Sequence, residues 1–180
     1  MTHRFTFTVS EAAYLQANRL NYWSAVRSGT LGWRFGSIFA FYFIIAIAVN
    51  YLNYIPFSQI AWFTILGVTL LAAAAVLLFC YGLGYFLLPR RTRKLFVQQK
   101  FIHLVQHFEV TDEAFISSSD LSTARLTYAM VHKWVENSHI FLIYLSDNTF
   151  IFLPVEIAGN EAIDAIRANL IAVGRPGKRL

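Results

Sequence analysis

The sequence has no charged residue across its centre. Asp, Glu, Lys, Arg and His are all missing between Arg34 and Arg90, a stretch of about 55 residues. A helix needs about 20 apolar residues to cross a hydrocarbon layer of about 30 Å, so this stretch is long enough for two crossings. A polar turn at residues 53–59 divides it. The sequence therefore predicts a two-helix transmembrane hairpin at residues 34–89, with spans at about 36–52 and 60–88.

The lack of ionisable groups in these spans argues against a transporter or pump. Proton relays and ion-coupled transporters place such groups at membrane depth. The hairpin does contain small residues at close spacing, Gly32 with Gly36 and Gly82 with Gly84. Small residues let helix backbones approach closely, but glycine is also common in transmembrane helices. The glycine pairs therefore indicate either helix packing, as in a homo-oligomer, or no specific contact.

Motifs of catalysis are also missing. The single cysteine, Cys80, excludes a disulfide framework and a thiolate metal site within one chain. No Gly-x-Ser-x-Gly elbow and no phosphate-binding glycine loop is present. His103 and His107, with Glu109 as a third ligand, form the strongest metal pattern, but polar positions on a solvated strand explain it more simply. We expect no enzymatic activity, no cofactor and no metal.

Positive charge is concentrated beside the uncharged centre. Arg34 precedes the first span, and Arg90, Arg91, Arg93 and Lys94 follow the second. The positive-inside rule then places both termini in the cytoplasm. These five side chains are expected to anchor the spans and to contact lipid headgroups. This distribution accounts for the net charge of +5 without nucleic-acid binding.

The N-terminal arm, residues 1–33, predicts a strand followed by an amphipathic helix. Apolar and polar residues alternate over 3–9, and Thr8 or Ser10 caps the helix that follows, with Glu11 completing a Thr-x-x-Glu capping box. A lone strand is not stable in water. We therefore expect the arm to pack on the C-terminal domain and its strand to join a sheet there.

The C-terminal segment, residues 90–174, predicts a small antiparallel sheet closed by a helix. Apolar spacing typical of a helix covers 159–173, and a flexible tail is expected over 175–180. The fold class is therefore α+β, a transmembrane hairpin with a domain of pleckstrin-homology-like architecture. Period-two segments predict strands at 104–110, 115–117, 125–128, 133–136, 139–145 and 149–153.

Part of this segment resembles a known family. Residues 126–136 carry Trp134 in a predicted strand, 141–144 form an aromatic strand, and 150–154 run into Pro154. These features are similar to the YcxB-like family of bacterial membrane proteins. The resemblance implies a multi-pass protein of the bacterial inner membrane with a C-terminal strand domain. Val155 stands where family members often have Lys.

Three functional hypotheses follow from these predictions. In the first, the cytosolic domain is a non-enzymatic module that binds a protein partner or membrane lipid. Trp134 and Tyr144 are its candidate contact residues, with core packing as the alternative for Trp134. In the second, the chain is a membrane immunity protein that neutralises a bacterial toxin. In the third, it is a subunit of an oligomeric membrane channel.

Overall fold

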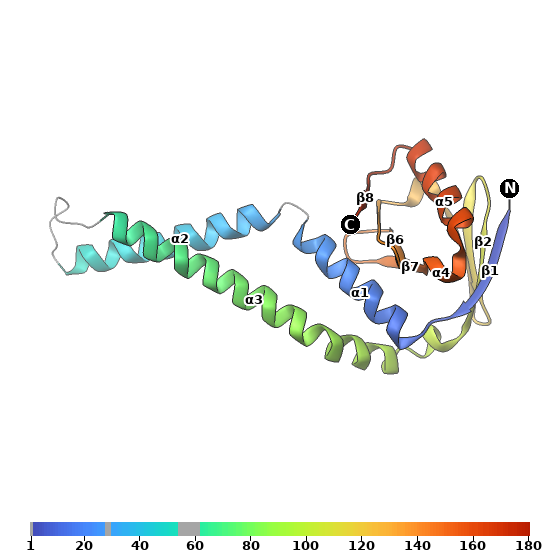
Figure 1. Ribbon diagram of the computed structural model, residues 1–180, viewed down its shortest axis with the longest axis horizontal. Helices are drawn as coiled ribbons and strands as arrows, with labels where there is room; N and C mark the ends of the chain where they lie inside the picture. The colour runs from blue at the N-terminus through green and yellow to red at the C-terminus, as the bar shows by residue number, and fades with distance from the viewer. Residues whose placement is uncertain (1, 28–29, 54–61) are drawn as a thin grey trace. The chain divides into compact units, whose positions relative to one another are not determined.

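The computed structural model describes residues 2–27, 30–53 and 62–180. The chain forms two compact units (Figure 1). Ala25–Leu87 make up the hairpin unit, and the residues up to Ser24 together with Leu88–Leu180 make up the strand domain. The strand domain is therefore assembled from two segments of chain that flank the hairpin unit.

The hairpin unit is built from two long apolar helices, α2 (Thr30–Leu52) and α3 (Trp62–Gln98). Both are long and apolar enough to cross a membrane. Helix α3 has 37 residues and continues through Pro89 into the strand domain. Proline removes one backbone hydrogen bond from a helix interior, yet α3 does not end there. Apart from Asn53, the predicted loop at 53–59 lies outside the described residues.

The first sheet of the strand domain has the order β1-β2-β3-β4 and is antiparallel throughout. Strand β1 (His3–Thr8) precedes the hairpin unit, whereas β2 (Val105–Val110) follows it. Strands β3 (Ala114–Ser119) and β4 (Ser122–Thr127) complete the sheet. Phe5 and Phe7 both stack on Phe108, as the alternation of apolar residues in β1 predicts.

The second sheet has the order β7-β6-β5-β8. Strands β5 (Lys133–Glu136), β6 (Ile140–Tyr144) and β7 (Phe150–Pro154) are antiparallel, and the short α4 (Val155–Ala158) follows β7. Strand β8 (Gly177–Arg179) is parallel to β5. The sequence predicts a flexible tail there, but Gly177–Arg179 pair with the edge of the sheet. Two short 3₁₀ turns, η2 (Lys100–His103) and η3 (Tyr128–Met130), precede β2 and β5.

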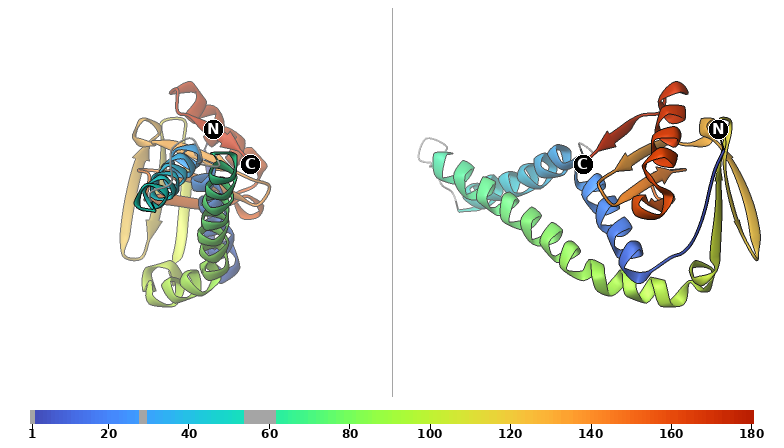
Figure 2. Two further views of the ribbon diagram at one scale, coloured as in Figure 1. Left: turned by 90° about the vertical axis from the view of Figure 1, so that its left-hand side faces the viewer. Right: turned by 45° about the vertical axis from the view of Figure 1, so that its right-hand side comes forward.

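Each face of the second sheet is covered by a different layer. Helix α1 (Glu11–Val26) buries Ala17 and Leu20 against one face. Helix α5 (Asn160–Ala172) lies between the two sheets and closes the other face (Figure 2). Strand β6 is buried along its whole length because both of its faces are covered.

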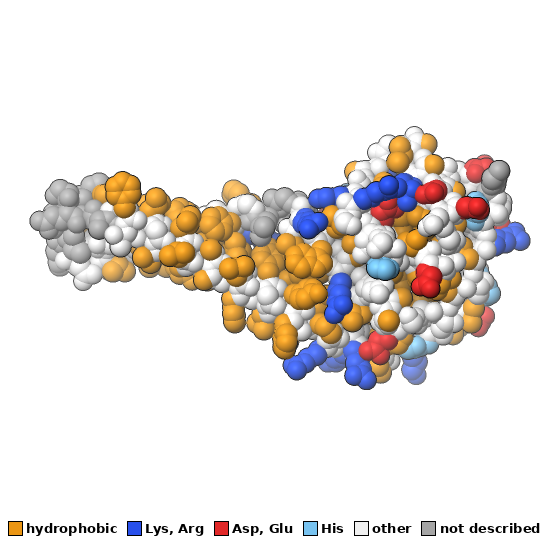
Figure 3. Space-filling view, in the orientation of Figure 1, with side chains coloured by type: hydrophobic (Ala, Val, Ile, Leu, Met, Phe, Trp, Pro, Cys, Tyr) orange, Lys and Arg blue, Asp and Glu red, His pale blue; other side chains and the backbone are white. Residues whose placement is uncertain are grey.

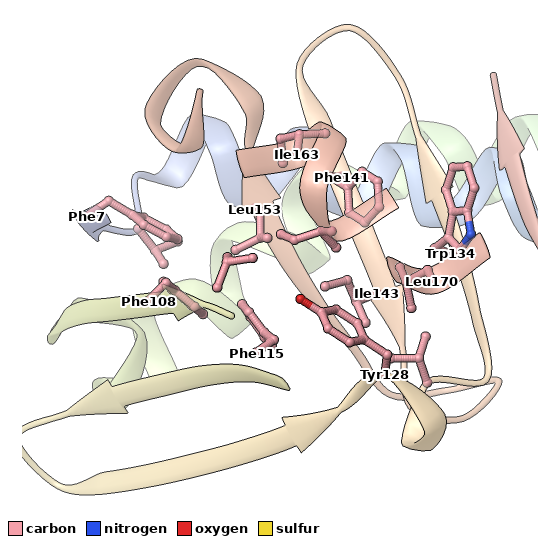
Figure 4. Packing of buried hydrophobic residues seen from close by; sticks show 14 of the residues in the cluster. Phe7, Phe108, Phe115, Tyr128, Trp134, Phe141, Ile143, Leu153, Ile163 and Leu170 are labelled. Carbon is pink, nitrogen blue, oxygen red and sulfur yellow. The ribbon is translucent and has the colours of Figure 1, made fainter. Parts of the chain in front are cut away.

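The main core lies between the two sheets and α5 (Figure 4). Phe141 from β6 stacks on Trp134 from β5 at 5.5 Å between ring centroids. Leu153 from β7 and Ile166 from α5 are also fully buried in this core. Two long apolar helices, antiparallel sheets and a C-terminal helix confirm the predicted α+β class.

Candidate ligand-binding surfaces

The basic residues after the second span lie on the last turns of α3. Arg90, Arg91, Arg93 and Lys94 are exposed, whereas Thr92 between them is buried. Arg93 Nε lies 3.6 Å from the carboxylate of Glu11, an exposed pair that adds little stability. Thr92 therefore lies on the packed side of this part of α3. The four basic residues next to it in the sequence are exposed to solvent.

Arg34 and the glycines lie in the hairpin unit. Arg34 Nη1 donates a hydrogen bond of 2.9 Å to the hydroxyl oxygen of Tyr81, which joins α2 to α3. A Cβ atom added to Gly32, Gly36 or Gly82 meets nothing within 4 Å among the described residues. Gly84 is partly exposed. Within the described chain, the three open glycines therefore make no close helix contact, and a packing role for them needs a second molecule.

The two aromatic residues predicted as partner contacts both lie in the interior. Trp134 is 6% exposed and belongs to the main core, while Tyr144 is 2% exposed and faces α1. The Tyr144 hydroxyl donates a hydrogen bond of 2.8 Å to Asn21 Oδ1, and burial raises its pKa. Neither ring is therefore available to a partner in this structure. The burial of Trp134 favours the alternative prediction, that it packs in the core.

The histidines of the metal pattern have separate partners. The His103 ring lies 3.0 Å from the carbonyl oxygen of Phe96 in α3. The His107 ring lies 3.0 Å from the Thr6 hydroxyl in β1. Glu109 accepts a hydrogen bond of 2.8 Å from Arg4. The three side chains thus each hold a local contact, and no group of three metal-ligating residues occurs among the described residues.

A buried ionic network, not predicted from the sequence, lies beside β8. The Glu136 carboxylate accepts hydrogen bonds of 3.1 and 2.8 Å from Arg167 of α5 and also pairs with Arg179 of β8. Arg167 pairs in addition with Asp164. A buried carboxylate is costly unless it is paired, so Arg167 and Arg179 stabilise it. The partners are distant in sequence and share no motif, so no sequence signal identifies them.

A cavity of about 450 Å³ opens within the strand domain, also without a sequence signal. Phe7 of β1, Phe108 of β2 and Phe152 of β7 line its walls. Tyr14 of α1 lines it too and donates a hydrogen bond of 3.2 Å to Gln99 Oε1. Burial raises the pKa of Tyr14. The walls therefore come from segments that meet only in the folded domain.

The edge of the first sheet is exposed along β4. Every residue of Ser122–Thr127 is exposed except Leu126, which is half-buried. Strand β4 pairs only with β3 among the described strands, so its other edge has no strand partner there. Arg125 carries the one charge of the strand and contacts Glu113. An edge of this kind can accept a further strand.

Residues 110–170 match the family model described as YcxB-like protein. The match confirms the resemblance predicted from the Trp134 strand and the strand that runs into Pro154. It begins at the last residue of β2 and ends within α5, so it covers most of the strand domain and excludes both long apolar helices. No curated protein and no solved structure gives a significant match.

Proposed function

We propose that this protein is an integral membrane protein that displays a non-enzymatic, pleckstrin-homology-like binding module on the cytoplasmic side of a bacterial inner membrane. The pairing of β1 with β2 is the observation that carries this proposal. These neighbouring strands flank the two candidate spans in the chain. Two strands can pair only on one side of a membrane, and two crossings return the chain to the side from which it started.

The distribution of charge supports the cytoplasmic side. Arg90, Arg91, Arg93 and Lys94 are exposed at the end of α3 that joins the strand domain. Such residues stay in the cytoplasm during insertion, and each contributes about 1 kcal/mol near an anionic leaflet. Figure 3 shows charged side chains over the strand domain and mostly apolar ones over the hairpin unit.

The partner of this module is a protein that adds a strand to β4. Five of the six residues of β4 are exposed, and the backbone groups of its edge provide affinity without a deep pocket. Ser122, Thr123 and Ala124 have small side chains, so a partner backbone can approach closely. The antiparallel sheet β1–β4, the antiparallel strands β5–β7 and the C-terminal helix α5 support the pleckstrin-homology-like architecture.

The orientation is tested with reporters that are active only outside the cytoplasm. We expect no activity at either terminus and activity from a fusion in the 53–59 loop. Activity at either terminus contradicts the proposed orientation. This experiment does not depend on the identity of the partner.

The binding role is tested by affinity purification of the tagged full chain in mild detergent, with mass spectrometry. We expect a stoichiometric protein partner that is lost in Ala124→Lys, because a lysine on an edge strand disfavours strand addition. Ala172→Lys is the matched control, since Ala172 is exposed on α5 and distant from β4 in sequence. Recovery of the chain with only itself and lipid contradicts the proposed partner.

A further inference from the structure

The cavity of the strand domain has an apolar interior. Phe7 and Phe108 stack with their ring centroids 5.3 Å apart and form one wall. Phe152 and Tyr14 also line it, with their ring centroids 6.0 Å apart. In Figure 4, Phe7 and Phe108 lie together at one end of the core, and Trp134 lies at the other. The cavity thus includes residues from one end of the core.

The cavity also lacks charge. No Asp, Glu, Lys, Arg or His occurs among the described residues that line it. Its polar lining consists of amides and hydroxyls, among them Asn18, Gln99, Gln106 and Thr149. A phosphate or another fully charged group buried in such a lining has no countercharge, which is costly. The ligand that fits is therefore a hydrocarbon chain, and any charged end of the molecule has to stay in water outside the cavity.

The size of the cavity and its position in the chain narrow the choice of ligand. Its volume of about 450 Å³ lies in the lower part of the range of about 300–1,000 Å³ for small-molecule sites. Phe101, which lines it, is 58% exposed. Gln99 lines it as well and directly follows α3, the helix that carries the second candidate span. An apolar ligand can therefore enter past the exposed ring of Phe101, next to the end of α3.

We infer that this cavity binds the acyl chain of a single-chain lipid, a fatty acid in its simplest form. The chain lies among Phe7, Phe108 and Phe152, and the carboxylate of the fatty acid stays in water outside the cavity, beside the half-buried Gln99 and Gln106. The inference goes beyond the proposed protein partner at β4. It rests on the proposed function in one respect, which is that the strand domain lies next to a bilayer.

The test uses the full chain in phospholipid nanodiscs and a fatty acid that carries a photoreactive diazirine at the end of its chain. After irradiation, mass spectrometry locates the cross-links. We expect cross-links on β1, β2 and β7 at residues of the cavity wall. Cross-links confined to Ala25–Leu87, the candidate spans, overturn the inference, because they report only lipid dissolved in the bilayer.

Two substitutions that fill the cavity sharpen the test. Val9→Trp fills it from the residue that follows β1 and Ser117→Leu from β3, since both residues line it. Each should remove the wall cross-links while retaining those on the spans. Met130→Trp is the control, because Met130 is exposed and outside the lining. Ser117 is half-buried whereas Val9 is buried, so Ser117→Leu provides a result even if Val9→Trp fails to fold. Wall cross-links that persist in the filled variants overturn the inference.

Competition by unlabelled fatty acids gives a measurement that needs no variant. Each added methylene that enters the cavity should tighten binding by about fourfold. This gain should stop at the chain length that fills the cavity. A gain that continues over the whole series, as bilayer partitioning gives, overturns the inference. These results are independent of the pull-down with Ala124→Lys, so a failure of the lipid site is distinguishable from a failure of the β4 interface.

Discussion

The two units of this chain use the same apolar side chains in opposite ways. In the hairpin unit Phe63 is 92% exposed, whereas Phe141 in the strand domain is fully buried. The hairpin unit has many more exposed apolar residues, including Leu71 and Phe79 of α3. In the strand domain most large apolar residues are covered by other protein atoms. An apolar surface of this size is unfavourable in water, so the environment expected around the hairpin unit is lipid.

The two units differ in the solvent that suits their surfaces, which is water for the strand domain and lipid for the hairpin unit. The strand domain gains its stability from removing apolar area from water. In the lipid environment proposed for it, the hairpin unit gains no hydrophobic stabilisation from contacts between its own helices, because hydrocarbon is as apolar as their side chains. Substitutions of one residue type should therefore have very different consequences in the two units, and pairs of matched variants measure that difference.

The largest expected effect comes from Phe141→Ala. Removal of a fully buried ring that stacks on Trp134 should lower the unfolding free energy of the strand domain by about 3–5 kcal/mol. The control is Phe63→Ala in the hairpin unit, which should change that free energy little. Both are measured by denaturant titration in detergent, followed by near-ultraviolet circular dichroism. Equal losses in the two variants contradict the comparison.

The next pair tests lipid exposure directly. Leu71 of α3 and Leu121 of the β3–β4 turn are 71% and 77% exposed, so their exposed fractions are closely matched. Arginine at the centre of a span costs about 2.5–3.5 kcal/mol on insertion. Leu71→Arg should therefore reduce the fraction of chain that resists alkaline carbonate extraction from membranes, and Leu121→Arg should leave it unchanged. The same extraction behaviour for both variants contradicts a membrane location for α3.

A glycine pair tests packing in a similar way. A Cβ atom at Gly177 lies 1.7 Å from the Trp134 indole ring, whereas one at Gly82 meets open space. Gly177→Ala should therefore displace β8, at a cost of about 1–3 kcal/mol, and expose Trp134 to an added fluorescence quencher. Gly82→Ala should not destabilise α3, because alanine is the better helix former. Unchanged quenching of Gly177→Ala contradicts the packing of β8 on Trp134.

The smallest effect concerns alkaline pH. Burial raises the pKa of Tyr144, so the folded state holds its hydroxyl neutral above the usual value of about 10. The stabilisation is fully present below that value and is lost as pH rises through the higher folded pKa. Tyr144→Phe should cost about 1 kcal/mol at neutral pH through the lost bond to Asn21. It should also reduce the fall in stability above about pH 10.

The control for this prediction is Tyr51→Phe. Tyr51 is an exposed residue of the hairpin unit, so its loss should leave the pH dependence of the strand domain unchanged. Unfolding free energies are compared across a pH series in detergent. A pH curve for Tyr144→Phe that follows the original chain contradicts a buried, neutral hydroxyl at this position.

The sequence predicts elements that depend on local pattern. The uncharged centre predicts α2 and α3, and alternation predicts β1, β2 and the strands that follow. The run Ile140–Tyr144 is entirely apolar, which is typical of a strand that is covered on both faces. The resemblance carried by Trp134 and Pro154 agrees with the family match to residues 110–170.

The sequence does not predict features that depend on contacts between distant segments. Strand β8 consists of Gly177, Lys178 and Arg179, which carry no apolar pattern. Its position depends on the Trp134 ring and on the Glu136 carboxylate, both of which lie far away in the chain. The cavity has the same character, because β1, α1, β2 and β7 each contribute part of its wall. The spacing of residues within any one segment therefore cannot predict such a cavity.

The insertion of the hairpin unit between β1 and β2 also sets an order of assembly. Arg4 and its partner Glu109 are 105 residues apart, so β1 emerges from the ribosome long before β2 is synthesised. In the proposed topology both helices enter the membrane during that interval, while β1 has no partner strand. A chain whose second helix fails to insert leaves the two strands in different compartments. In the proposed topology the first sheet can therefore be completed only after both helices have crossed the membrane.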